Sequence, residues 1–276
     1  MAPVITKPAL LAVSTSLREA RERQGLGVRE LARQLGVSPS RVSNWELGTH
    51  EPKPTVAARL LGSLQVGGSE FDQILEISEH LSDRNFIDQS SSRLVNLLWA
   101  YEKLASRIVE WAPFAIPDLL QTPTCGDAVV DIPLTRSDRL EQERFHRQFR
   151  HETLDEGTRQ YVFMIGEQAL DNLRNDPNAA RQQIAHLRAS EKLKHITIRV
   201  APTTVRASRS MSPFTLFELG AGAFAVALRH NYCTSYLTDA VLVGGYSDTA
   251  RALQRQGIKD FMTVEQWSDS VERQAS

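Results

Sequence analysis

The stretch Leu31–Gly48, LARQLGVSPSRVSNWELG, constrains the fold of this chain more than any other segment. It contains two short helical patterns that meet at Gly36, and glycine is the residue that adopts a left-handed backbone without a steric penalty. The apolar positions of both patterns fall on one side of each helix: Leu31, Ala32, Leu35, Val37, Val42 and Trp45. This arrangement predicts two helices that pack against each other across a tight turn.

The second of these helices, expected over Ser38–Glu46, has an unusually polar outer side. Ser38 is a candidate N-cap, and Pro39 stands at the first helical position, where its missing N–H has no cost. With the apolar face turned inward, the outer face and its edge carry Ser40, Arg41, Ser43 and Asn44. Such a helix can enter the major groove of DNA, where Asn44 could pair with adenine and Arg41 with guanine or a phosphate.

Positive charge is confined to the opening part of the chain. Residues 10–64 hold eight Arg or Lys and five Glu, a net charge of +3, whereas residues 65–80 have a net charge of −4 and the whole chain −1. Arginine, which accounts for seven of those eight cations, suits phosphate and base-edge contacts. We therefore predict that the following residues contact DNA: Arg29, Arg33, Ser38, Ser40, Arg41, Ser43, Asn44 and Lys53. Of these, Ser38 and Ser40 are expected to contact phosphates directly or through bridging waters.

The segment LREARERQGLGVRELARQLGVSPSRVSNWELGTHEPKP resembles the lambda-repressor-like (XRE) helix-turn-helix family, over about residues 14–80. In that family an arginine four residues before the first glycine pairs with a glutamate after the recognition helix. Arg21 and Glu46 occupy these positions. The resemblance thus implies a structural ion pair that orients the recognition helix, and double-stranded DNA as a partner. Where the family often has a phosphate contact, this chain has Gly27 and Val28, for which the arginines at 29 and 33 could compensate.

The rest of the chain has a mixed pattern. A long helix is expected over about Arg93–Trp111 and a charged one over Ser137–His151. The runs QYVFMI, HITIRV, FTLFEL, AFAVAL and CTSYL read as strands, with helices at 167–173, 178–192 and 249–256 and a hairpin turn at LGAGAFA. The expected fold is therefore a mainly α, five-helix helix-turn-helix domain at 14–80, a polar linker at 81–92, and an α+β domain with a small sheet at 93–270.

EWAPFAIPDLLQTP, RFHRQ, HITIRVAP and SPFTLFEL resemble, in this order, the C-terminal domain of actinobacterial WhiJ-like regulators. Asp118 stands where that group usually has glycine. Several of these regulators are encoded beside small partner proteins, in an arrangement like that of toxin and antitoxin pairs. The resemblance implies a regulatory or partner-binding role for this part of the chain.

Other site types have little support in the sequence. Cys125 and Cys233 lie far apart and outside metal-ligand spacing, which fits a reducing cytoplasm, although a redox-sensing thiol pair stays an alternative. His146 and His151 are five residues apart, whereas zinc-binding pairs on a helix are usually four apart. No nucleophile elbow or membrane-length apolar run is visible. We expect no metal, cofactor, catalytic residue or membrane span, and we expect a loose N-terminal arm. Arg144, Arg147 and Gln148 could bind an anionic ligand, although a charged run of this kind more often forms the solvent-exposed face of a helix.

These observations favour a cytoplasmic, sequence-specific DNA-binding transcriptional regulator, and not an enzyme. Its C-terminal domain is expected to form a homodimer and to receive a small molecule or a small protein as a signal. The alternative is an antitoxin-like protein that sequesters a small partner protein and autoregulates its operon.

Overall fold

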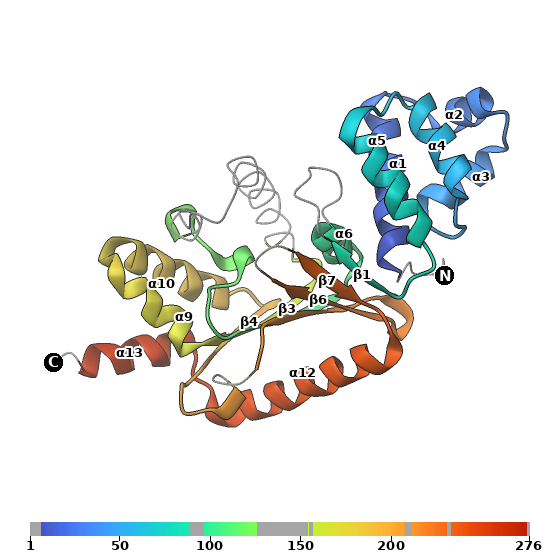
Figure 1. Cartoon of the computed structure of the whole chain (residues 1–276). Coiled ribbons are helices and arrows are strands. Elements are labelled where there is room, and N and C mark those ends of the chain that lie inside the picture. The colour runs from blue at the N-terminus through green and yellow to red at the C-terminus, as the bar shows by residue number, and fades with distance from the viewer. Residues whose placement is uncertain are drawn as a thin grey trace. The chain divides into compact units, whose positions relative to one another are not determined.

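The computed structural model of the chain describes residues 7–88, 97–125, 154, 157–207, 211–230 and 233–274 (Figure 1). The chain divides into two compact units. Unit 1 consists of Met1–Leu104, Leu219–Ala225 and His230–Leu242. Unit 2 consists of Ala105–Glu218, Val226–Arg229 and Val243–Ser276.

Unit 1 opens with the five predicted helices, followed by one 3-10 turn, η1 (Ser78–His80). The helices are α1 (Pro8–Arg23), α2 (Val28–Leu35), α3 (Pro39–Glu46), α4 (Pro54–Ser63) and α5 (Gly68–Ile77). They enclose one apolar core, in which Leu17, Leu31, Val42 and Leu61 are all at most 1% exposed. The prediction of a helical N-terminal part is confirmed.

The first helix is longer than the sequence pattern indicated. The stretch MAPVITKPALLAVS is expected to be a loose arm, but α1 begins at Pro8, where proline's fixed φ suits the first helical turn. Ala9 and Val13 are fully buried in the same core. The expected arm is therefore wrong from Pro8 onwards, because these small apolar residues are covered by neighbours distant in sequence.

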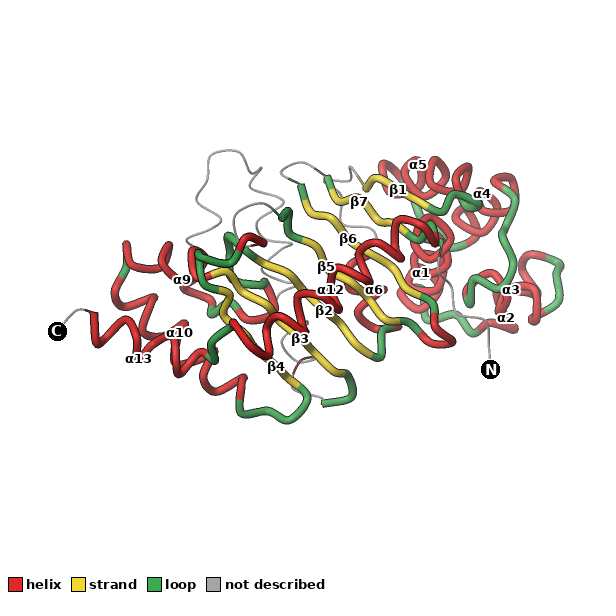
Figure 2. The backbone as a smooth tube through the Cα atoms, turned by 90° about the horizontal axis from the view of Figure 1, so that it is seen from below, coloured by secondary structure: helices red, strands yellow, loops and turns green. Residues whose placement is uncertain are grey.

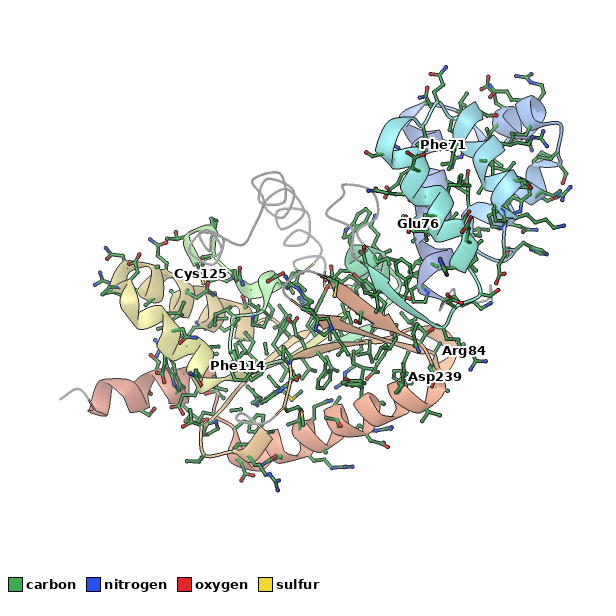
Figure 3. The ribbon with its side chains drawn as sticks, in the orientation of Figure 1. Phe71, Glu76, Arg84, Phe114, Cys125 and Asp239 are labelled. Atoms are coloured by element: carbon green, nitrogen blue, oxygen red, sulfur yellow. The ribbon has the colours of Figure 1, made fainter. Side chains whose placement is uncertain are left out.

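Unit 1 also contains three elements outside the helical bundle. A strand and a helix follow the bundle in sequence, and a second strand comes from a distant part of the chain. β1 (Asn85–Asp88) lies within the stretch expected to be a linker, and it pairs antiparallel with β7 (Thr234–Leu237). α6 (Leu97–Leu104) places Tyr101 against Tyr236 of β7, with ring centroids 5.7 Å apart. Arg84 and Asp239, labelled in Figure 3, lie 3.9 Å apart at the end of this pair of strands.

The strands of the chain hydrogen-bond in the order β1-β7-β6-β5-β2-β3-β4 (Figure 2). This seven-stranded mixed sheet corrects the expectation of a small sheet, because two strands escaped the sequence pattern. The remaining strands are β2 (Arg107–Ala112), β3 (Gln160–Gly166), β4 (Ile196–Ala201), β5 (Phe214–Glu218) and β6 (Phe224–Arg229). The 3-10 turn η4 (Gly220–Gly222) connects β5 to β6, which confirms the predicted hairpin.

The helix expected over 93–111 is wrong in its second half. α6 ends at Leu104, and Arg107–Ala112 forms β2, which pairs parallel with β3 and antiparallel with β5. Ile108, Val109 and Trp111 are at most 1% exposed. A central strand is apolar on both faces, so its sequence lacks the alternation that marks a half-exposed strand.

The helices of unit 2 pack on its strands. They are α9 (Glu167–Asp171), α10 (Pro177–Glu191), α12 (Ala240–Asp260), whose first residues belong to unit 1, and α13 (Val264–Gln274), with 3-10 turns η2 (Asp118–Leu120) and η3 (Asn172–Asn175). α12 runs along the strand face that carries Phe214, whose ring lies 5.2 Å from that of Tyr246. The predicted helix Ser137–His151 lies outside the described residues.

Candidate nucleic-acid interface

The turn between α2 and α3 has the geometry that the sequence predicted. Gly36 has a φ of +65° and closes α2 in the left-handed region. The N–H of Val37 donates to the carbonyl of Ala32 at 3.0 Å, and the N–H of Gly36 donates to that of Arg33 at 3.2 Å. These bonds satisfy the last carbonyls of α2, as in a Schellman cap. The chain is thereby turned sharply before α3 begins.

α3 is fixed in unit 1 by its apolar face. Val42 is fully buried and Trp45 is 6% exposed, and both belong to the core of the bundle. Ser38 is the N-cap residue and Pro39 the first helical residue, but the Ser38 hydroxyl lies 3.0 Å from the Ser40 hydroxyl and makes no cap bond. The orientation of α3 is thus set by packing and not by an N-cap bond.

The outer face of α3 is polar and accessible. Ser38, Ser40 and Arg41 are exposed, and Ser43 and Asn44 are half-buried. The main-chain carbonyl of Asn44 accepts hydrogen bonds from Thr49, whereas its side-chain amide has no hydrogen-bond partner within the described part of the chain. The Arg41 guanidinium carbon lies 5.5 Å from the centre of the Trp45 ring, a cation–π distance. The amide and guanidinium therefore remain on the solvent side of the helix.

Exposed cations flank α3 on neighbouring elements. Arg29 lies in the first turn of α2, and Arg33 lies in its last turn with 80% of its side chain exposed. The nearest carboxylate to Arg33, that of Glu30, is 3.7 Å away on the same exposed surface, and such a pair contributes little. Lys53 is the exposed N-cap residue of α4. These exposed side chains place positive charge on α2 and at the start of α4, the helices that precede and follow α3 in the chain.

Arg21 of α1 holds the C-terminal end of α3. Its Nε and Nη2 donate to the two carboxylate oxygens of Glu46 at 2.7 and 2.9 Å, and its Nη1 donates to the carbonyl of Leu26 at 2.8 Å. Glu46 is only 6% exposed. The hydrogen bonds that Arg21 donates to the Glu46 carboxylate raise the pKa of the Arg21 guanidinium above its ordinary value. This bidentate pair joins α1, the α1–α2 turn and α3.

Two further arginines, whose role the sequence pattern did not indicate, support these helices. Arg18 donates to the main-chain carbonyl of Glu46 at 2.9 Å, and Arg59 of α4 donates to that of Leu35 at 3.1 Å. Each satisfies a carbonyl at or next to the end of a helix, where a cation also faces the negative end of the helix dipole. The signal for Arg18 was its position three residues before Arg21, on the same face of α1.

The other candidate sites do not assemble in the described residues. Cys125 is buried, Cys233 is half-buried, and neither forms a disulfide. A ring nitrogen of His195 lies 2.8 Å from the Leu154 carbonyl, which indicates a structural role. No group of three or more His, Cys, Asp or Glu in the described ranges could hold a metal. The remaining candidates lie outside these ranges: Arg144, His146, Arg147, Gln148 and His151.

Asp118 begins η2, at the position where the WhiJ-like group usually has glycine. Its carboxylate pairs with Arg229 of β6 and accepts a hydrogen bond from Gln121 at 3.4 Å. Asp118 is not among the residues with a positive φ. The backbone here does not require glycine, and the side chain gains an ion pair instead.

None of the helices in the described ranges is long and apolar enough to span a membrane.

The comparisons with known proteins agree with this geometry. Residues 12–74 match a helix-turn-helix domain family, so this part of the chain is a helix-turn-helix domain. Residues 95–265 match the family described as a domain of unknown function, DUF5753. Because that match covers more than half of the chain, the chain belongs to this family.

Similarity to characterised proteins is low. No curated protein matches the chain. Among solved structures, one match is described as the structure of TrmBL2, an archaeal chromatin protein with a novel mode of DNA binding. It is 14% identical over 80% of this chain and 71% of that chain, with a TM-score of 0.30. This similarity is too low to define a shared fold.

Proposed function

We propose that the chain is a transcriptional regulator that binds double-stranded DNA in a sequence-specific manner. The observation that carries the proposal is the helix-turn-helix itself: α3 is fixed by Val42, Trp45 and the Arg21–Glu46 pair, while its outer side chains are accessible. A helical bundle that does not bind DNA has no need for such a helix. The proposed function requires no catalytic step.

In this proposal Arg41 and Asn44, on the outer face of α3, read bases. Asn44 would pair with adenine and Arg41 would contact guanine or a phosphate, because the amide and guanidinium forks match those base edges. Arg29, Arg33, Lys53 and the serines would contact phosphates and set the register. Each good bidentate base contact contributes about 1–3 kcal/mol of discrimination.

The regulator is proposed to act as a homodimer. Dimers of this module read two half-sites about one helical turn, roughly 34 Å, apart. A palindromic operator would then be recognised by two copies of α3. Sedimentation of the chain with and without its operator measures this stoichiometry, and a complex with a single copy on a full operator would contradict it.

The experiment that tests the proposal starts with selection of genomic fragments bound by the full chain, followed by affinity measurements on the selected operator. We expect Asn44→Ala to lose discrimination between operator and mutated operator by roughly 1–3 kcal/mol while keeping most non-specific binding. The operator affinity of Arg41→Ala is compared with that of the control variant Arg255→Ala. Arg255 is an exposed arginine of α12 that the proposal does not use. Affinity should also fall steeply with salt. Identical sequence preference in wild type and Asn44→Ala would refute the role of Asn44.

An antitoxin-like role is the second candidate. In it the chain binds a small partner protein, and DNA binding serves autoregulation. The observation that favours it is an acidic groove beside a sheet edge in unit 1, described below. Co-purification of a small protein encoded next to this chain, together with loss of regulation when that protein is deleted, would support this role over simple operator control.

A further inference from the structure

A groove of about 460 Å³ lies in unit 1 between α5, η1 and β1. Its walls come from two segments: Gln73, Glu76, Ile77 and His80 on the helical side, and Asp83, Asn85, Phe86, Ile87 and Asp88 on the other. Its volume is within the range of sites that bind ligands. Figure 3 labels Glu76 on α5, at the helical wall.

The groove runs beside the open edge of β1. All four residues of this strand line it, although successive side chains of a strand point to opposite faces. A cavity that meets all four must therefore lie along the strand's edge. β7 occupies the other edge, and β1 is the last strand in the sheet order of the described residues. An open edge presents N–H and C=O groups that can pair with an added strand.

The chemistry of the groove is acidic and partly apolar. Among the described lining residues, Glu76, Asp83 and Asp88 carry carboxylates, and His80, whose Nδ1 lies 3.1 Å from Oδ2 of Asp83, carries an imidazole. Ile77 and Phe86 are half-buried in the lining, and Ile87 is 57% exposed, which is unusual for isoleucine. The helical wall belongs to residues 65–80, whose net charge is −4.

We propose that this groove binds an extended, basic segment of a partner protein, which adds to β1 as a further strand. Main-chain hydrogen bonds to the edge would supply affinity, and alternate side chains would supply specificity. Lysine or arginine side chains of the partner face the acidic helical wall at Glu76, and the apolar side chains between them contact Ile77, Phe86 and Ile87. This surface is separate from α3 and does not depend on the proposed DNA contacts.

Charge selects this occupant over two others. A second copy of the chain paired through β1 would bring one set of three carboxylates towards another, and like charges facing each other disfavour such an interface. Nucleic acid is disfavoured for the same reason, because its phosphates would face these carboxylates. A basic segment of another protein has no such penalty.

The test measures binding of fluorescein-labelled peptides to the full chain by fluorescence anisotropy. The probe is a short peptide of alternating lysine and valine. A second peptide has the same sequence with N-methylated backbone amides, so it keeps its charge but cannot donate to a strand edge. We expect saturable binding of the first peptide and at least about tenfold weaker binding of the second, because the edge hydrogen bonds are lost.

Two matched variants locate the site. Glu76→Lys reverses a charge in the groove, whereas Glu79→Lys reverses one on the neighbouring exposed turn outside it. We expect Glu76→Lys to weaken peptide binding about five- to tenfold and Glu79→Lys to change it less than twofold. Both residues are exposed, so both variants should keep the fold.

Three results would overturn the proposal: no saturable binding at millimolar peptide, equal affinity of the two peptides, or equal effects of the two variants. Operator binding of the same variants is measured in parallel. If the wild-type chain bound no operator, the proposed function would be refuted and the peptide result would still stand. The two failures can therefore be told apart.

Discussion

Replacing Arg21 by methionine tests how α3 is held in unit 1. In the wild type this guanidinium donates to both carboxylate oxygens of Glu46, at 2.7 and 2.9 Å, and to the Leu26 carbonyl at 2.8 Å. Its side chain is 12% exposed and Glu46 is 6% exposed. Methionine keeps most of the apolar stem but leaves the carboxylate buried without its main partner.

The expected loss follows from this burial. Removing one member of a buried pair costs about 3–5 kcal/mol, because the remaining charge is left uncompensated. Since the Arg21 side chain is not fully buried, we take the lower end, about 3 kcal/mol. Every 1.4 kcal/mol is a factor of ten in an equilibrium constant, so the opening equilibrium of α3 should rise by roughly a hundredfold.

Hydrogen–deuterium exchange of peptides that cover α3, in the full chain, measures this opening directly. Arg21→Met should raise exchange of these amides by roughly a hundredfold, while exchange in unit 2 stays unchanged. The double variant Arg21→Met/Glu46→Met replaces the pair by two apolar side chains and should recover much of the protection. Unchanged exchange in Arg21→Met, or a double variant no more protected than the single one, would refute the reasoning.

Three further predictions concern other positions. Gly36→Ala should destabilise unit 1 by about 1–2 kcal/mol, because its φ of +65° is left-handed, whereas Gly62→Ala inside α4 should stabilise it by about 0.5–1 kcal/mol; thermal unfolding compares them. Burial raises the pKa of Glu19 above 4.5, so its charging opposes folding. The free energy of unfolding of Glu19→Gln should therefore exceed that of the wild type once the pH has risen through that folded pKa. Urea unfolding should show this difference at pH 7 and not at pH 4. Gly166→Ala should prevent native packing of β3, because a Cβ there would lie 2.2 Å from the Pro113 carbonyl oxygen, and soluble yield and circular dichroism check it.

The helix-turn-helix was predictable because its determinants are local. The left-handed turn needs glycine at 36, and the inward positions of α3 recur at helical spacing, so residues close in sequence define the bend and the outer face. The Arg21–Glu46 contact was accessible only through the family resemblance. No local pattern links two residues in different helices.

Elements defined by distant partners were not predictable. β2 is a strand because β3 and β5 pair with it, and neither contact is visible in the run RIVEWA. β1 is a strand because β7, about 150 residues later, pairs with it. The same cause explains the acidic groove: its two walls are adjacent only after β1 joins the sheet. The charge of residues 65–80 was visible in the sequence, but its position beside an open strand edge was not.

Glu76→Lys also distinguishes the two proposed surfaces of unit 1 by their response to salt. If DNA binds at α3 and not in the groove, this substitution removes a carboxylate that repels phosphates and should strengthen operator binding by about 1 kcal/mol or less. The effect should be measurable at about 0.01 M salt, where the Debye length is roughly 30 Å, and be largely lost at about 0.15 M, where it is roughly 8 Å. A much larger gain that persists at about 0.15 M salt would instead mean that DNA phosphates lie next to the groove, and the separation of the two surfaces would be wrong.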